Sequence, residues 1–203
     1  AEHKKRIMTF YKSMLQRHLY ATGKKHFVSK NPAFSAKIET LAEFFPDARI
    51  LYLARNPLDM LPSTVSWINY ARNQFTGPNE GYLYTEEILE MTGHWYRHPL
   101  QYLDAHPSPR HLIVNYEDLI QRPEAVIRKF YEQFGYPDQP GLPVIIDQAV
   151  KETMTFNSDH SYSYKKMGFT REGIVERYKD IFERFNFETR EEAVHVERME
   201  LER

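Results

Sequence analysis

The chain has 203 residues, of which 41% are apolar and 14% aromatic, enough for the core of a folded domain and too many for an intrinsically disordered protein. Its 27 Lys and Arg are balanced by 28 Asp and Glu, so no overall charge attracts it to nucleic acid or to an anionic membrane, and we expect contact with neither. It contains no cysteine, which excludes disulfides, thiolate nucleophiles and Cys-based zinc sites.

The N-terminal part of the chain shows a helical pattern. Apolar residues recur every three or four positions over residues 2–20, and Gly23 follows as a stop signal. After the segment Lys30-Asn31-Pro32, Ser35 is expected to cap a second helix, which ends before Pro46.

Two apolar runs have the length and composition of strands, residues 50–54 and 111–116. Their continuous apolar character predicts strands that are buried on both faces of a parallel sheet. Helical patterns separate and follow them, over residues 58–75, 85–102, 123–134, 143–155 and 171–185. Two of these patterns contain an internal proline, Pro62 and Pro99, which a helix tolerates only near its start or at a kink.

Strands that alternate with helices predict an α/β fold with a parallel sheet flanked by helices. We expect a single domain over residues 1–203 with a helical C-terminal part, in which the charged tail 189–203 is exposed. The segment 157–166 is polar and aromatic without a clear period, and we expect it to form a loop.

Arg55 ends the first predicted strand, and Ser63 follows eight residues later in the next helix. Ligands of open parallel sheets bind beyond the carboxyl ends of the strands, where a planar guanidinium can hold a phosphate with two hydrogen bonds. The Ser63 hydroxyl could add a further hydrogen bond. An ion pair between Arg55 and Asp59 is the structural alternative, and spacing alone leaves both open.

The order of these segments resembles the sulfotransferases that use 3′-phosphoadenosine 5′-phosphosulfate (PAPS). In that family, a strand ends in Arg-(Asp/Asn)-Pro, and this Arg and a Ser eight residues later bind the cofactor's 3′-phosphate; Arg55 and Ser63 match this spacing. The segment Tyr116-Glu117-Asp118-Leu119 is similar to the family's Tyr-Glu-Asp-Leu, whose Tyr lies near the adenosine. The resemblance covers roughly residues 29–187 and implies a P-loop-NTPase-like sulfotransferase fold. It also implies PAPS as sulfuryl donor, adenosine 3′,5′-bisphosphate as product and no metal.

Lys30 is similar in its surroundings to the lysine of the protein-tyrosine sulfotransferase branch, which has Lys-(Asp/Asn)-Pro followed by an aromatic residue. In that branch the lysine assists the transfer and a glutamate upstream of it is the general base. The resemblance therefore implies a catalytic role for Lys30, and a surface lysine on a loop is the alternative.

The segment 160–166 lies where related enzymes return a serine and basic residues to the cofactor. The resemblance implies Ser163 as a catalytic residue beside the phosphosulfate and Lys165 or Lys166 as a ligand of the 3′-phosphate. His160 is an alternative general base, because imidazole titrates near neutral pH. A solvated turn and a packed histidine are the alternative interpretations.

The family's phosphosulfate loop, a Pro-(Lys/Arg)-Ser-Gly-Thr-Thr-like turn, has no counterpart before Ser29, where Gly23 is the only glycine. Such a loop holds the 5′-phosphosulfate with backbone amides and a basic side chain. Two interpretations stay open. The chain is the C-terminal two-thirds or so of a larger sulfotransferase, or it is a remnant that binds nucleotide poorly and works through a partner.

The preferred prediction is an enzyme that transfers a sulfuryl group to the hydroxyl or amine of a small-molecule, glycan or protein acceptor. The alternative is a non-catalytic module that binds 3′-phosphoadenosine. A P-loop kinase is disfavoured because no Gly-x-x-x-x-Gly-Lys-(Ser/Thr) run occurs. Acceptor contacts are expected in variable loops such as 73–84, near Trp67 and Trp95. A soluble, cytoplasmic protein is the default expectation, and the oligomeric state stays open.

Overall fold

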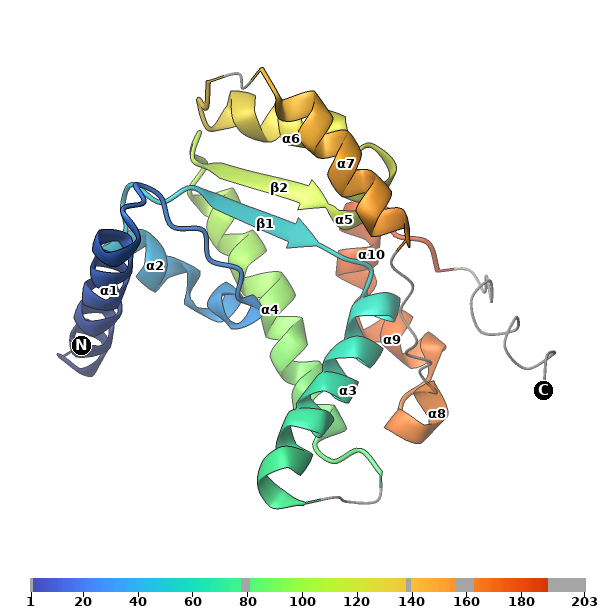
Figure 1. Ribbon diagram of the computed structural model, residues 1–203. Helices are drawn as coiled ribbons and strands as arrows, with labels where there is room; N and C mark the ends of the chain where they lie inside the picture. The colour runs from blue at the N-terminus through green and yellow to red at the C-terminus, as the bar shows by residue number, and fades with distance from the viewer. Residues whose placement is uncertain (1, 78–80, 138–139, 156–162, 190–203) are drawn as a thin grey trace. The chain divides into compact units, whose positions relative to one another are not determined.

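The structure is a computed structural model that describes residues 2–77, 81–137, 140–155 and 163–189 (Figure 1). Within these residues the chain separates into two compact units, which divide between Ala48 and Arg49. The elements are, in chain order, α1 (Glu2–Thr22), the 3₁₀ helix η1 (Pro32–Lys37), α2 (Ile38–Phe44), β1 (Ile50–Ala54), α3 (Pro57–Thr76), α4 (Thr85–Ala105), β2 (His111–Asn115), α5 (Tyr116–Gln121), α6 (Pro123–Gln133), α7 (Leu142–Thr155), α8 (Tyr164–Met167), α9 (Arg171–Arg177) and α10 (Lys179–Phe185).

The first unit is helical, and the prediction of its first helix is confirmed. Helix α1 ends before Gly23, which adopts a left-handed φ of 64° that other residues rarely adopt. Its Tyr11 ring packs edge-on against Phe34 at 5.7 Å and Phe45 at 5.9 Å between ring centres. These aromatic contacts join α1 to η1 and to the end of α2.

The prediction that Ser35 caps the second helix is wrong, because Ser35 lies inside η1. Asn31 caps η1, since its side-chain oxygen accepts a hydrogen bond from the backbone N–H of Ala33 at 3.0 Å, and α2 follows from Lys37 without a side-chain cap. Pro32 occupies the first position of η1, where its fixed φ is already suitable and its missing N–H is not needed.

The second unit contains the parallel sheet predicted from the two apolar runs. Strands β1 and β2 pair in parallel with Ala54 opposite Asn115. Helices α3 and α4 form the connection between the strands, as parallel pairing requires. Helix α4 lies on one face of the strand pair and α6 on the other (Figure 1). The α/β prediction is therefore confirmed, with a sheet of two strands in the described residues.

The prediction that both strands are buried on both faces is wrong for β1. The face with Tyr52 and Ala54 belongs to the main core, together with α3, α4, α9 and α10. On the opposite face, α6 covers Leu112 and Val114 of β2. That helix does not reach over β1, where Leu51 and Leu53 remain 44% and 40% exposed.

Both helical prolines lie inside their helices, Pro62 in α3 and Pro99 in α4. A proline has no N–H, so the carbonyl four residues earlier loses its helical donor. In α3 this carbonyl belongs to Leu58, which accepts from the Tyr164 hydroxyl at 2.9 Å. In α4 it belongs to Trp95, which accepts from the Tyr52 hydroxyl at 3.4 Å. Distant tyrosines thus supply the donors that the prolines remove.

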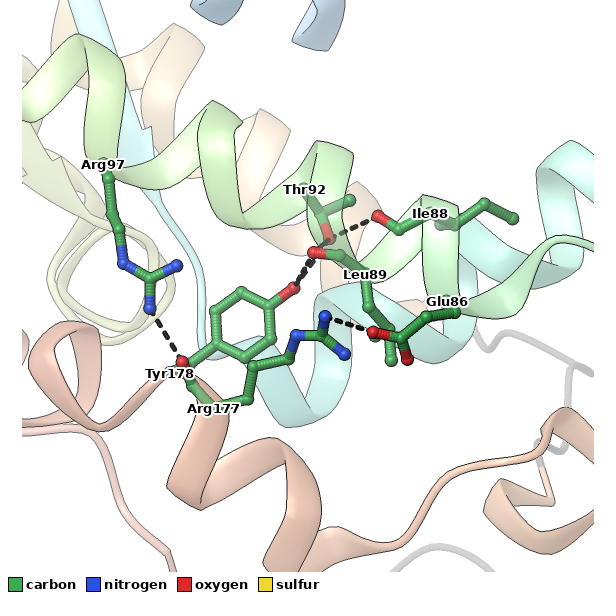
Figure 2. A network of polar contacts seen from close by, with 7 residues as sticks. All are labelled: Glu86, Ile88, Leu89, Thr92, Arg97, Arg177 and Tyr178. Atoms are coloured by element: carbon green, nitrogen blue, oxygen red, sulfur yellow. Dashed lines mark hydrogen bonds and ion pairs between the residues drawn. The ribbon is translucent and has the colours of Figure 1, made fainter.

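The single helix predicted over residues 171–185 is wrong, because the chain forms α9 and α10 with Tyr178 between them. Tyr178 is completely buried, and its hydroxyl donates to the carbonyl of Leu89 at 2.6 Å and shares a hydrogen bond with the Thr92 hydroxyl at 2.8 Å (Figure 2). The break inserts this ring beside α4, where a side chain at Gly93 would crowd the Arg97 guanidinium at 3.0 Å and only touch the ring at 3.9 Å.

Ion pairs join α4 to the two C-terminal helices. Arg97 donates two hydrogen bonds to Asp180 and one to the carbonyl of Arg177, and Arg184 donates two to Asp104. Hydrogen bonding to Arg97 and Arg184 lowers the pKa of Asp180 and Asp104. Their contribution to stability is therefore present above the ordinary carboxyl range and is lost as the pH falls through the lowered pKa. Because these side chains are half exposed, solvent reduces each contribution to about 1 kcal/mol or less.

Candidate functional site

Arg55 and Tyr116 follow the paired ends of the two strands and contact each other. Because Ala54 lies opposite Asn115 in the parallel register, the next residue of each chain emerges at the same edge of the sheet. The guanidinium carbon of Arg55 lies 5.0 Å from the centre of the Tyr116 ring, a cation–π geometry. Two residues predicted to bind the same nucleotide are thus brought together by strand pairing.

Arg55 is exposed directly after the end of β1. Across the residues described here, no ion pair joins Arg55 to Asp59 or to another acidic side chain. The structural alternative considered for Arg55 therefore does not occur, and its donors remain available for an anion.

Two residues that the sequence analysis did not select hold the backbone at Arg55. The buried Tyr96 hydroxyl donates to the carbonyl of Arg55. The buried Asn56 caps α3, since its side-chain oxygen accepts from the N–H of Leu58 at 3.0 Å and its amide donates to the carbonyl of Glu188 at 3.0 Å. An Asn before Pro at a helix start is a capping signal that could have identified Asn56. No local signal identifies Tyr96.

Ser63 lies in the second turn of α3 and is half-buried. The loop predicted over 157–166 is wrong at its C-terminal end, where α8 forms a single turn capped by Ser163. Lys165 and Lys166 lie on this turn and are exposed. In the described part of the chain no hydrogen bond joins Ser63 or these α8 side chains to Arg55, so the site has one direct contact, between Arg55 and Tyr116.

Lys30 belongs to the first unit, where it is exposed on a segment without regular secondary structure, directly before the Asn31 cap. Its helical neighbour η1 begins two residues later. His160, the alternative general base, lies outside the described residues. The roles of Lys30 and His160 therefore remain predictions.

Carboxylates also gather at the strand ends. Burial raises the pKa of Glu117, and the nearby negative charges of Asp59 and Glu188 raise it further. These charges oppose the binding of an anion. Arg55 is a cation at the strand ends that can offset these negative charges.

The residues at the strand ends fit the 3′-phosphoadenosine half of PAPS, because Arg55 offers unpaired donors beside an aromatic ring. The described residues contain no group of three His, Cys, Asp or Glu side chains that could hold a metal ion. None of the described helices combines the length and apolar character needed to cross a membrane.

Two groups of named relatives are similar in sequence to this chain. The omega-hydroxy-beta-dihydromenaquinone-9 sulfotransferases Stf3 of Mycobacterium bovis and Mycobacterium tuberculosis are 24% identical over 174 residues, which cover 84% of this chain and 43% of theirs. The 3-alpha-hydroxysteroid sulfotransferase of Cavia porcellus is 26% identical over 150 residues, which cover 68% of this chain and 52% of that enzyme. The chain thus spans about half the length of these relatives or less.

The crystal structure of sulfotransferase STF9 from Mycobacterium avium superposes with a TM-score of 0.61 at 20% identity, over 78% of this chain and 41% of that one. At this identity the likeness establishes the fold. The matched family model, described as "Sulfotransferase family", covers residues 1–140. This range includes Lys30, Arg55, Ser63 and Tyr116, the residues on which the resemblance was based. With most of the chain matched, and with the strand-end arginine and tyrosine in contact, the chain belongs to the sulfotransferase family.

Proposed function

We propose that this protein transfers a sulfuryl group from PAPS to an acceptor hydroxyl or amine. PAPS supplies the activated sulfuryl group. The acceptor oxygen or nitrogen forms a bond to sulfur while the bond from sulfur to the bridging phosphate oxygen breaks. The electron pair leaves with adenosine 3′,5′-bisphosphate, and the acceptor proton passes to a base. This chain contributes the residues that hold the nucleotide and neutralise charge, because such a transfer depends mainly on positioning and electrostatics.

The contact between Arg55 and Tyr116 carries the proposal. It supports a half-site in which the exposed guanidinium takes the 3′-phosphate with charge-assisted hydrogen bonds. The Ser63 hydroxyl, two helical turns further along α3, is assigned to the same phosphate, and Tyr116 to the adenosine. The hydrogen bond from Tyr96 to the Arg55 carbonyl limits the movement of this backbone and favours a preformed site.

We assign the acceptor to the class of small molecules with a hydroxyl group. The names of the relatives give a hydroxylated menaquinone for the mycobacterial enzymes and a hydroxysteroid for the guinea-pig enzyme, both apolar molecules. Helix α3 carries the exposed aromatic residues Trp67, Tyr70 and Phe75. Phe75 also belongs to the segment 73–84 that was expected to contact the acceptor, and these exposed aromatic side chains would suit an apolar molecule.

The proposal is tested by calorimetric titration of the chain with adenosine 3′,5′-bisphosphate and with adenosine 5′-monophosphate. We expect the bisphosphate to bind about tenfold more tightly or better, since it gains hydrogen bonds to charged groups. Equal affinity for the two nucleotides would contradict the assignment of the 3′-phosphate to Arg55. Binding without transfer from PAPS to a hydroxylated acceptor would favour the non-catalytic alternative.

The predicted role of Lys30 is tested by Lys30→Ala. We expect this variant to lose turnover while its affinity for adenosine 3′,5′-bisphosphate stays close to that of the original protein, because the ammonium acts on charge that develops during transfer. Lys37→Ala is the matched control, since Lys37 is an exposed lysine of the same unit at the end of η1. Equal losses in turnover and affinity would assign Lys30 to binding.

A further inference from the structure

The hydrogen bond from Tyr164 to Leu58 joins two segments that both carry predicted nucleotide ligands. Leu58 lies in the first turn of α3, three residues after Arg55, and Tyr164 opens α8 between Ser163 and Lys165. The two residues are 106 positions apart in the sequence. The position of α8 beside the start of α3 is therefore a tertiary contact.

Pro62 makes this contact available. In an unbroken helix the Leu58 carbonyl would accept from the N–H of residue 62, but proline has none and its ring pushes the carbonyl away from the helix axis. An unpaired carbonyl in a partly buried position is costly, so a donor from outside the helix is strongly favoured. The Tyr164 hydroxyl is that donor, at 2.9 Å.

The surroundings of Tyr164 keep its hydroxyl in place. The ring contacts Phe169 at 5.5 Å between ring centres, and the neighbouring Met167 is almost fully buried in the main core. Burial raises the pKa of Tyr164, so the hydroxyl stays protonated and able to donate at neutral pH. Ser163 caps the turn by accepting from the N–H of Lys166 at 3.4 Å.

We propose that Tyr164 is a positioning residue of the nucleotide site, whose hydroxyl replaces the missing N–H of Pro62 and so holds Ser163, Lys165 and Lys166 beside the segment that begins with Arg55. This inference rests on the proposed function, which assigns nucleotide to these residues. The two lysines reach the 3′-phosphate only when α8 keeps its place against α3. The hydroxyl acts through α8 and does not itself touch the nucleotide.

The test is a double-mutant cycle of Tyr164→Phe and Pro62→Ala, with affinity for adenosine 3′,5′-bisphosphate measured by calorimetry. Tyr164→Phe alone should weaken binding by roughly three- to tenfold, the scale of one net hydrogen bond. Pro62→Ala restores a helical N–H to the Leu58 carbonyl. In the Pro62→Ala protein, the loss of binding free energy caused by Tyr164→Phe should be less than about half of the loss that it causes in the unmodified protein.

Tyr52→Phe is the matched control. It removes the same kind of hydrogen bond, from a tyrosine hydroxyl to a carbonyl freed by a helical proline, but Tyr52 lies in β1 and its hydroxyl bonds to α4; among the described residues no hydrogen bond joins it to α8. We expect Tyr52→Phe to lower thermal stability about as much as Tyr164→Phe and to leave nucleotide affinity unchanged.

The outcomes separate the inference from the function on which it rests. If the original protein binds no bisphosphate, both are overturned. If it binds and Tyr164→Phe binds equally well, or if Pro62→Ala does not reduce the effect of Tyr164→Phe, the positioning role alone is overturned. A loss of affinity in Tyr52→Phe equal to that in Tyr164→Phe would also overturn it, because general destabilisation would then explain both.

Discussion

Replacing Arg55 with alanine is expected to weaken the binding of adenosine 3′,5′-bisphosphate by about 1.5–3 kcal/mol, or roughly 10- to 150-fold. Arg55 is an exposed cation at the strand ends, and no ion pair with a carboxylate of the described residues neutralises it. Asp59, Glu117 and Glu188 lie nearby, so removing Arg55 leaves a phosphate among negative charges. The loss should therefore lie toward the upper end of this range. Calorimetric titration measures it directly.

The variant Arg55→Lys separates charge from geometry. Lysine keeps the positive charge but cannot form two parallel hydrogen bonds to one phosphate, so an intermediate loss is expected. Arg128→Ala is the matched control, because Arg128 is an exposed arginine of α6 that pairs with Glu124. Unchanged affinity in Arg55→Ala would contradict the assignment of the 3′-phosphate to Arg55.

Replacing Tyr178 with alanine is expected to lower the free energy of unfolding by about 3–5 kcal/mol, the usual cost of deleting a large buried aromatic side chain. Tyr178 is completely buried between α4 and the two C-terminal helices, and its hydroxyl contacts Leu89 and Thr92 (Figure 2). Its ring also packs edge-on against Tyr96 at 5.8 Å, and Tyr96 donates to the Arg55 carbonyl. The core network thus continues to the strand ends.

Urea unfolding followed by circular dichroism gives the free energy of unfolding. The comparison holds when the dependence of this free energy on urea concentration has the same slope in the variant and the unmodified protein. Tyr178→Phe keeps the ring and removes the hydroxyl, and should cost about 1–3 kcal/mol because the Leu89 carbonyl loses a buried donor. Tyr70→Ala, at an exposed tyrosine of α3, should change stability by about 0.5 kcal/mol or less. A similar small change in Tyr178→Ala would show that the described network does not stabilise the fold.

Local patterns were sufficient for most individual elements. The apolar run at 50–54 formed β1, and the run at 111–116 formed β2 except for Tyr116, which begins α5. The helical period identified α1, α3, α4, α6 and α7. These signals depend on neighbouring residues alone, because strand and helix repeats set which side chains share a face. These local signals failed where tertiary packing determined where a helix starts or breaks. Ser35 lies inside η1, which Asn31 caps, and the pattern over 171–185 gave no sign of the break at Tyr178.

For the candidate site too, some features follow from the sequence and others only from the folded chain. The sequence by itself determined the family, through the spacing of Arg55 and Ser63 and the later Tyr116, since such motifs are read along the chain. Only the tertiary structure decided that Arg55 contacts Tyr116, because this follows from the parallel register of two strands. The tertiary structure also explains how α3 and α4 tolerate their internal prolines, Pro62 and Pro99. The tyrosine donors come from 106 and 43 residues away, and hydrogen bonds over such separations depend on the folded chain rather than on any local pattern.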